Sequence, residues 1–443
     1  MKTIVILHGW NDTSASFTSL AAWLRKQALP VVDIYLGDYV TKADEVTLFD
    51  LGFAFERALA AAGVVQLPKN FNLIVHSTGG LVAREYLRQV CSGDATRAPI
   101  EHLVMLAPAN FGSPLASLAK SVLGRLFEGW NWNTPFQTGQ QVLNGLELAS
   151  AYSWDLADAD LFDPAFPVLA PQNVLTTVLA GTIPYDGIQS VEFQNGSDNV
   201  VFVSTASLNA HRFTLDFSTP SLPMFTQKPR TCGRIALAVF PRDHTDMHDP
   251  NLASRQADWQ RIVLAALNVD PAGYSAHAAA CDVVSYQTFS DGMQTNQPDW
   301  YHQYMHVVFR CRDQYNNPIN DFVIEFYQEN NDPTDVVFQK IHKDIIESIH
   351  NNSVTPNLTS FLMDTTDLNA WLTANPQHAV RMSASAAALS DRISYRNPPN
   401  DITGGVEVFG GPNGTFIFPN EPVLVDVILS RDPTADVFKL TRA

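Results

Sequence analysis

Residues 71–87 read FNLIVHSTGGLVAREYL, and this stretch decides the fold. Its first five residues form an apolar run typical of a buried strand, and the residues after Gly80 have the apolar spacing of a helix. A strand that turns sharply into a helix with a serine at the apex is a nucleophile elbow. The stretch therefore predicts that Ser77 is a nucleophile. It also predicts that the backbone N–H of Thr78, at the helix start, faces the position where an oxyanion forms.

The elbow departs from the usual G-x-S-x-G pattern at one position. Val75 stands two residues before Ser77, where glycine normally relieves crowding, whereas Gly79 and Gly80 are present on the other side. A β-branched residue there predicts either a slightly opened elbow or a small residue that faces Val75 from a neighbouring strand.

The elbow lies within a longer alternation of apolar runs and helical patterns, which extends from residue 1 to about 268. The expected strands are 3–7, 31–36, 71–75, 102–106, 174–180 and 235–240, and the expected helices include 16–26, 48–62, 81–87 and 252–267. Continuous apolar strands that alternate with helices indicate a mostly parallel sheet with helices on both faces. The alternation breaks down at about 111–171, where apolar and aromatic residues predict a cap-like insertion.

The pattern changes after a linker at 268–273, so we expect a second domain at 275–443. Short runs separated by turn signals predict strands at 305–309, 322–327, 336–339, 360–363, 380–383, 406–409, 415–418 and 423–429, with one short helix at 367–372. This spacing is typical of an antiparallel β-sandwich.

A nucleophilic serine needs a histidine base and an acid that orients it, and in this fold class the chain order is serine, acid, histidine. The acid should follow the strand at 174–180, where Asp198 is favoured over Asp186. The base should follow the strand at 235–240, where His244 is favoured over His248. The reaction requires neither a metal nor a cofactor.

The second oxyanion donor should follow the first strand, where the sequence reads His8-Gly9-Trp10. Glycine lets the backbone approach the substrate, and the N–H of Trp10 is then the expected donor. We count His8, Gly9, His76, Gly79 and Gly80 as supporting residues. The stretch 107–114, which reads APANFGSP, is expected to support the site as a loop.

These residues resemble those of bacterial α/β-hydrolase lipases over residues 1 to about 268. The elbow without a leading glycine, the opening His8-Gly9-Trp10 and the β-rich C-terminal half are similar to the PlaB-type bacterial phospholipase A/lysophospholipase family. The resemblance implies hydrolysis of glycerophospholipids and lysophospholipids, with Ser77, Asp198 and His244 as the catalytic triad. It also implies peripheral membrane association without a secretion signal and assembly into homo-oligomers.

Composition narrows the alternatives. A formal net charge of −17 argues against a nucleic-acid partner and against a polybasic membrane patch. The four cysteines form no C-x-x-C pair, so reduced thiols are expected. We see no secretory signal and no apolar run long enough to span a bilayer, so we expect a cytoplasmic or peripherally membrane-associated protein of a bacterium.

A triacylglycerol lipase or general carboxylesterase remains an alternative function, as does a non-catalytic scaffold that binds a partner protein through the C-terminal domain.

Overall fold

The computed structural model describes residues 2–10, 12–29, 31–40, 42–116, 139–184, 194–218, 224–330, 332–399, 403–410 and 416–441. Contacts divide the chain into two compact units. The N-terminal unit comprises residues 1–210 and 230–302, and the C-terminal unit comprises residues 211–229 and 303–443.

This division differs from the expected boundary near residue 268 for two reasons. Helix α9 (Tyr274–Gly292) packs on strand β8 (Ala236–Phe240) of the N-terminal unit. The hairpin of β6 (His211–Asp216) and β7 (Met224–Lys228) joins a sheet of the C-terminal unit, because β6 pairs with a strand more than 200 residues later in the chain.

The N-terminal unit is built on one six-stranded sheet in the order β2-β1-β3-β4-β5-β8, and every neighbouring pair is parallel. Its remaining strands are β1 (Lys2–Leu7), β2 (Val31–Gly37), β3 (Phe71–His76), β4 (Ile100–Leu106) and β5 (Leu175–Gly181). Its other α-helices among the described residues are α1 (Thr18–Arg25), α2 (Leu48–Ala61), α3 (Gly79–Cys91), α5 (Gln140–Leu146), α6 (Ala151–Asp160), α7 (Val203–Ala206) and α8 (Gln256–Ala266). Short 3-10 helices cover Ser14–Phe17, Ala95–Arg97, Asp246–His248 and Pro298–Tyr301.

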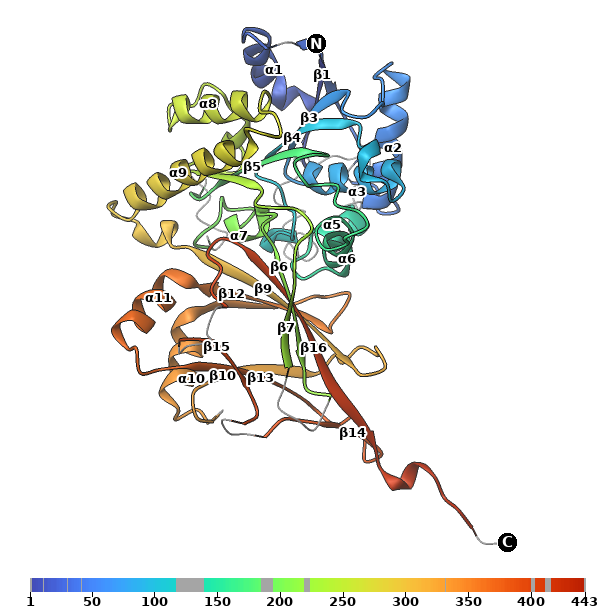
Figure 1. Ribbon diagram of the computed structural model, residues 1–443, viewed down its shortest axis with the longest axis vertical. Helices are drawn as coiled ribbons and strands as arrows, with labels where there is room; N and C mark the ends of the chain where they lie inside the picture. Colours follow the sequence, from blue (N-terminus) through green and yellow to red (C-terminus); the bar gives the residue numbers. More distant parts are fainter. Residues whose placement is uncertain are drawn as a thin grey trace, which may run out of the picture. The chain divides into compact units, whose positions relative to one another are not determined.

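Helices cover both faces of this sheet, as expected (Figure 1). Helices α1, α8 and α9 pack on one face, where Ile4, Ile6 and Ile74 belong to a single buried cluster. Helices α2 and α3 lie on the other face and pack against each other. Strands β3, β5 and β8 are buried along their whole length, which explains their continuous apolar sequences.

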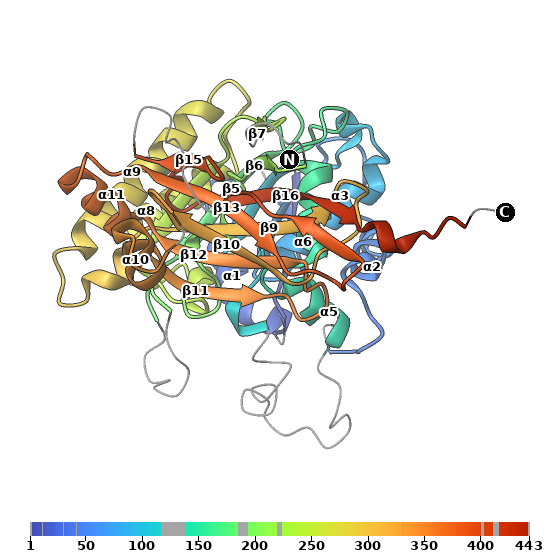
Figure 2. The ribbon, with the colours of Figure 1, turned by 90° about the horizontal axis from the view of Figure 1, so that it is seen from below.

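The C-terminal unit contains two sheets, which Figure 2 shows with β10 and β13 in front of the larger one. The larger sheet runs β11-β12-β9-β16-β6-β7 with β14 paired to β16, and the smaller runs β10-β13-β15. Its strands are β9 (Tyr304–Asp313), β10 (Phe322–Tyr327), β11 (Ile346–Asn351), β12 (Leu358–Asp364), β13 (Val380–Ala386), β14 (Ile393–Arg396), β15 (Val406–Phe409) and β16 (Pro422–Pro433). Strand β16 is parallel to both β9 and β6, whereas the other pairs are antiparallel. One apolar core draws residues from both sheets, as in a sandwich.

Two expectations for this unit need correction. The run at 336–339 is not a strand but helix α10 (Val336–Lys340), because the side chain of Asp335 accepts the N–H of Phe338 and caps a helix there. α10 continues into a π-helical turn, Ile341–Ile345, and the expected helix at 367–372 lies within α11 (Thr365–Ala374). Within the expected strand at 415–418, Thr415 lies outside the described residues, and residues 416–418 are irregular. A last 3-10 helix covers Ala435–Val437.

The cap-like insertion expected at 111–171 is described in part. Its residues 117–138, which include Phe127, Trp130, Trp132 and Phe136, lie outside the described residues. Within the described part, Trp154, Phe162 and Phe166 are buried and pack in the N-terminal unit. Among the helices that the structure describes, none is long and apolar enough to cross a membrane.

Candidate active site

Ser77 occupies the sharp turn between β3 and α3. Its backbone has φ +53°, the left-handed region that L-residues rarely adopt. The N–H of Ser77 donates to the carbonyl oxygen of Leu106 at 3.0 Å, and the N–H of Gly80 donates to the carbonyl oxygen of Ser77 at 3.0 Å. The strand, the turn and the helix therefore have the geometry of a nucleophile elbow.

Val75 fits into this elbow because a glycine faces it. A Cβ atom added to Gly79 would lie only 3.2 Å from the Cβ of Val75 and 3.1 Å from the carbonyl oxygen of His8. The small residue facing Val75 is therefore at the start of helix α3 and not on a neighbouring strand. Gly80 likewise lies against the loop after β4, since its added Cβ would be 2.8 Å from the Cβ of Pro108.

Asp198 lies in the loop that follows β5 and is 1% exposed. Its Oδ1 accepts the backbone N–H groups of Val200 and Val201, at 3.0 and 2.7 Å. Its Oδ2 lies 2.8 Å from Nδ1 of His244. Each carboxylate oxygen thus has a defined partner. The alternative acid, Asp186, lies outside the described residues.

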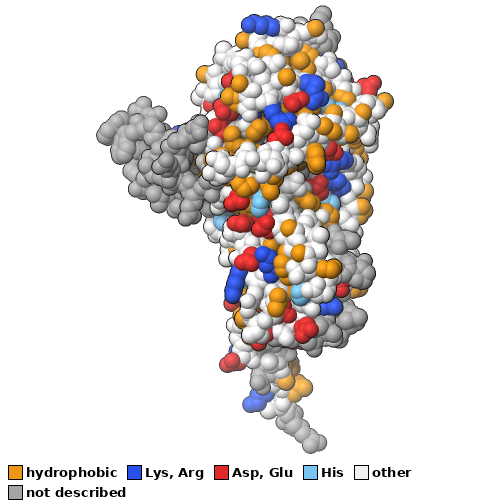
Figure 3. Space-filling model, turned by 90° about the vertical axis from the view of Figure 1, so that its left-hand side faces the viewer, with side chains coloured by type: hydrophobic (Ala, Val, Ile, Leu, Met, Phe, Trp, Pro, Cys, Tyr) orange, Lys and Arg blue, Asp and Glu red, His pale blue; other side chains and the backbone are white. Residues whose placement is uncertain are grey.

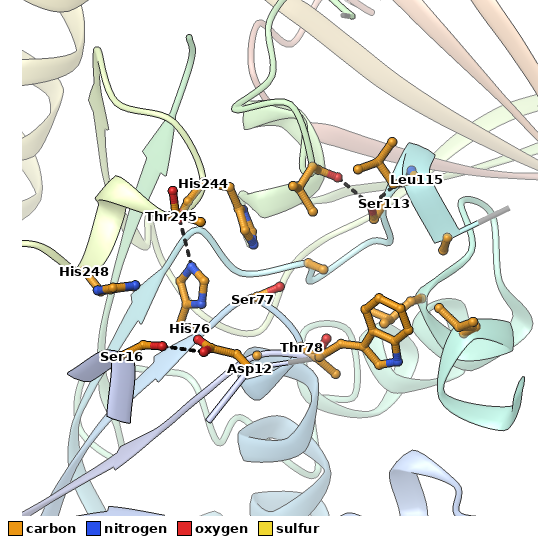
Figure 4. Close-up of a pocket in the computed structure, with 17 residues that line it drawn as sticks. Asp12, Ser16, His76, Ser77, Thr78, Ser113, Leu115, His244, Thr245 and His248 are labelled. Atoms are coloured by element: carbon orange, nitrogen blue, oxygen red, sulfur yellow. Dashed lines mark hydrogen bonds between the residues drawn. The ribbon is translucent and has the colours of Figure 1, made fainter. Parts of the chain in front are cut away.

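His244 lies in the loop after β8, at the carboxyl end of the sheet. Because the carboxylate of Asp198 accepts at Nδ1, the imidazole carries its proton on that atom and keeps a lone pair on Nε2. The backbone N–H of His244 also donates to the carbonyl oxygen of Asp198 at 3.2 Å. His244 and Ser77 line the same cavity (Figure 4).

This cavity has a volume of about 590 Å³. Both apolar and polar side chains line it. The apolar lining residues are Ala109, Leu115, Ala116, Leu143, Leu146 and Val200; the polar ones include Asp12, Ser16, Thr245 and His248. Within the described part of this cavity, no three His, Cys, Asp or Glu side chains converge as metal ligands would.

The two expected oxyanion donors, Trp10 and Thr78, both line the cavity. Thr78 precedes helix α3 as its N-cap, where backbone N–H groups have no acceptor within the helix. Gly9 lies directly against Ser77, since an added Cβ would be 2.6 Å from the Cβ of Ser77. Only glycine fits at this position without displacing Ser77.

His8 fixes the loop that carries Gly9 and Trp10. Its Nδ1 donates to the carbonyl oxygen of Gly9 at 2.6 Å, and its Nε2 accepts the backbone N–H of Tyr39 at 3.1 Å. The Tyr39 hydroxyl in turn donates to the carbonyl oxygen of His8 at 2.6 Å, and the two rings stack at 4.3 Å. His8 therefore holds the backbone of the loop that carries Gly9 and Trp10 in place.

His76 and His248 pack around His244. The ring centroid of His76 lies 4.6 Å from that of His244 and 5.4 Å from that of His248. Burial, together with the neighbouring His244 and His248, holds the pKa of His76 well below its usual value. Burial also lowers the pKa of His248, which contacts Phe17 at 4.6 Å.

Arg242 organises the loop around His244, and no motif in the sequence singled it out. It is 0% exposed. Its guanidinium donates to the carbonyl oxygens of four residues of the following loop, Asp246, Asp249, Leu252 and Ser254. It also lies over the ring of Trp259 at 5.1 Å. Burial lowers its pKa to about 10. The chain after His244 is thus folded around one buried cation.

The loop 107–114 supports the opposite side of the site. The hydroxyl of Ser113 donates to the carbonyl oxygen of Val200, two residues after Asp198, at 2.5 Å. The side-chain amide of Asn110 donates to the carbonyl oxygen of Ala206 at 2.8 Å, and Arg84 donates to the carbonyl oxygen of Asn110 at 3.0 Å. These bonds hold the loop of Asp198 against the end of β4.

Two solved structures share the overall fold of this chain. Two structures of phospholipase PlaB from Legionella pneumophila, one of them in complex with thio-NAD, match with a TM-score of 0.81 at 24% sequence identity, over 100% of this chain and 96% of that chain. The mature form of lipase BlEst2 from Bacillus licheniformis matches with a TM-score of 0.37 at 18% identity, over 60% of this chain and 92% of that chain. No protein-family model matches the sequence, and no curated protein matches it.

The likeness to PlaB extends over both units, so it includes the mixed sheets of the C-terminal unit as well as the parallel sheet. The expected fold class is confirmed. The chain has the fold of PlaB, with an α/β-hydrolase sheet and a β-rich C-terminal unit.

Proposed function

We propose that the protein is a serine hydrolase that cleaves carboxylic ester bonds of glycerophospholipids and lysophospholipids. One observation carries the proposal: Asp198 is hydrogen-bonded to His244, and His244 shares an apolar-walled cavity with Ser77 at the turn of an elbow. In the proposed reaction Ser77 is the nucleophile, His244 the base and Asp198 the acid that orients the base.

In the proposed mechanism, Nε2 of His244 takes the proton of Ser77 as the Ser77 oxygen attacks the ester carbonyl. Asp198 keeps the proton of His244 on Nδ1 and stabilises the imidazolium that forms. The N–H groups of Trp10 and Thr78 stabilise the oxyanion, each by about 3 kcal/mol as estimated from comparable sites. His244 then protonates the leaving alcohol, and water releases the acyl group from Ser77 by the same steps. Because the scheme uses no metal, EDTA should leave the activity unchanged, and inhibition by EDTA would contradict it.

Two observations support the proposed substrate class, the lining of the cavity and the fold. A largely apolar lining suits an acyl chain, and the volume of about 590 Å³ lies in the range of small-molecule pockets. The whole-chain likeness to PlaB, whose structure is described as that of a phospholipase, favours phospholipid over other esters.

The test has two steps. Hydrolysis of p-nitrophenyl butyrate that is lost in Ser77→Ala, with an unchanged melting temperature, would distinguish an enzyme from a non-catalytic scaffold. Fatty-acid release is then compared among phosphatidylcholine vesicles, lysophosphatidylcholine micelles and an emulsion of triacylglycerol. Faster release from the two phospholipids supports the proposal. Release from triacylglycerol alone would favour the lipase alternative.

The partners are proposed on the resemblance of the sequence to the PlaB-type family. We infer peripheral contact with membranes and assembly into homo-oligomers, and we infer no role for nucleic acid. On the face drawn in Figure 3, the described basic side chains lie among acidic and apolar ones and not in one continuous patch. Vesicle flotation tests the membrane contact, and light scattering with gel filtration tests the oligomeric state.

A further inference from the structure

His76 joins the strand that carries Ser77 to the loop that carries His244. It is the last residue of β3, and its Nε2–H donates to the backbone carbonyl oxygen of His244 at 3.0 Å. Both residues are buried, with 4% and 6% of their surfaces exposed. Building on the proposed function, we propose that His76 is a positioning residue whose Nε2–H holds the imidazole of His244 at the correct place relative to Ser77.

The hydrogen bonds between His244 and Asp198 do not fix His244 relative to Ser77. One comes from the side chain of His244 and one from its backbone N–H. These bonds fix His244 relative to the loop after β5, whereas Ser77 lies at the end of β3. The bond from His76 is a link between the backbone of the base and the residue next to the nucleophile, so it sets the distance on which proton transfer depends.

Packing fixes the ring of His76 for this task. Phe17, His244 and His248 surround it, with ring centroids at 5.8, 4.6 and 5.4 Å. On its remaining side lies Gly9, where an added Cβ would come within 3.3 Å of Nδ1 of His76. Nδ1 is buried and has no hydrogen-bond partner among the described residues. Since a carbonyl oxygen only accepts, the proton of the neutral ring must be on Nε2.

A neutral ring is also the form that the proposed reaction needs. Burial is the main cause that lowers the pKa of His76, and His244, His248 and His8 lower it further by their charge when protonated. The ring is therefore uncharged near neutral pH, and no positive charge at 4.6 Å opposes the imidazolium that His244 becomes. His76 contributes a directed N–H without the repulsion that an arginine or lysine would bring.

The experiment compares two substitutions in the full-length chain. His76→Leu removes the donor, and His76→Gln places a side-chain N–H within reach of the Nε2 position. We expect His76→Leu to lower kcat for p-nitrophenyl butyrate by about 100-fold with KM nearly unchanged, because a misplacement of about 1 Å is worth that much. We expect His76→Gln to recover at least tenfold of that loss. The rate at which a fluorophosphonate probe labels Ser77 should follow the same order.

Matched variants keep the outcome decisive. His277 is another buried histidine of the N-terminal unit, where its Nε2 pairs with the hydroxyl of Thr177, so His277→Leu should lower stability without lowering kcat. If His76→Leu fails to fold, His76→Phe tests the same loss of donor with a planar ring. Equal kcat in His76→Leu and His76→Gln, or wild-type kcat in His76→Leu, would overturn this inference and leave the proposed function standing. Absence of Ser77-dependent activity in the wild type would overturn the proposed function and the inference with it.

Discussion

Asp198 and His244 are joined twice, once through their side chains at 2.8 Å and once through their backbones at 3.2 Å. The backbone bond fixes the position of the loop after β8 relative to the loop of Asp198, and the side-chain bond fixes the rotation of the His244 ring. Because the two bonds come from one residue, the ring and the loop cannot shift independently. The arrangement orients Nε2 of His244 before any substrate arrives.

Asp198→Asn should lower kcat by about 10⁴-fold with little loss of stability. The amide oxygen can still accept the N–H groups of Val200 and Val201, whereas its NH₂ group then faces His244. The NH₂ group forces the proton of His244 onto Nε2, where it can no longer accept a proton from Ser77. Ester hydrolysis and thermal unfolding of the variant and the wild type check this expectation. A variant with more than about a tenth of wild-type kcat would contradict it.

Gly9→Ala should abolish most of the activity, by about 100-fold or more. The new methyl group would lie 2.6 Å from the Cβ of Ser77, so either the nucleophile or the oxyanion loop must move. Gly233→Ala is the control, because nothing lies within 4 Å of its added Cβ and its φ is not positive. Equal activity of the two variants would show that the loop of Gly9 adjusts freely.

Arg242→Lys should destabilise the N-terminal unit by about 3 kcal/mol, and it should lower kcat as well. A lysine has three donors on one atom and cannot reach the four carbonyl groups that the guanidinium joins, so buried acceptors are left without partners. Arg261→Lys is the matched control, since Arg261 is half exposed and, in the part of the chain that the structure describes, bonds only to Asp258 in its own helix. Urea unfolding gives the free energies, and a difference below about 1 kcal/mol between the two variants would contradict the prediction.

The C-terminal unit should lose stability in mild acid through His306. Burial lowers the pKa of His306 to about 3, and both of its ring nitrogens lack partners among the described residues. The unfolded chain takes up a proton below about pH 6.5, whereas the folded chain does so only near pH 3. The free energy of unfolding therefore falls as the pH falls through this window, by about 1.4 kcal/mol per unit. Between pH 7 and pH 5 the wild type should lose about 2 kcal/mol more than His306→Leu in urea unfolding. Equal losses would show that His306 does not contribute.

Removing residues 419–443 should prevent the C-terminal unit from folding. The deletion takes away β16 and, with it, the buried side chains of Val423, Val425, Val427 and Leu429, each of which contributes about 2 kcal/mol. Deletion of 438–443 is the control, because the side chains of Phe438 and Leu440 are mostly exposed. Limited proteolysis should degrade the C-terminal unit of the longer deletion and spare that of the shorter one.

The sequence predicted those features that depend on neighbours along the chain. The parallel sheet and the elbow follow from local periodicity and from the serine at the apex, and chain order alone selected the loops of Asp198 and His244. The structure brings these loops together, and the catalytic roles of their residues stay predictions.

The features that the sequence did not predict depend on partners far away. The carbonyl groups that Arg242 binds converge only when the loop closes around Arg242. No spacing of residues in the sequence therefore predicts these hydrogen bonds. Helix α10 begins Val-Val-Phe, a run whose β-branched residues favour a strand until Asp335 caps it. The hairpin of β6 and β7 has no other partner nearby in the sequence, because β6 pairs with β16 across some 200 residues.

The position of β16 has a consequence for synthesis of the protein. The larger C-terminal sheet has β9 and β6 on either side of a strand that the ribosome makes last, at residues 422–433. Until β16 emerges, the hairpin at 211–228 lacks the strand through which it joins its sheet. The residues on either side of the hairpin in the sequence belong to the N-terminal unit. Ribosome-bound chains that end before residue 422 therefore carry an exposed hairpin, a site that a chaperone would recognise during translation.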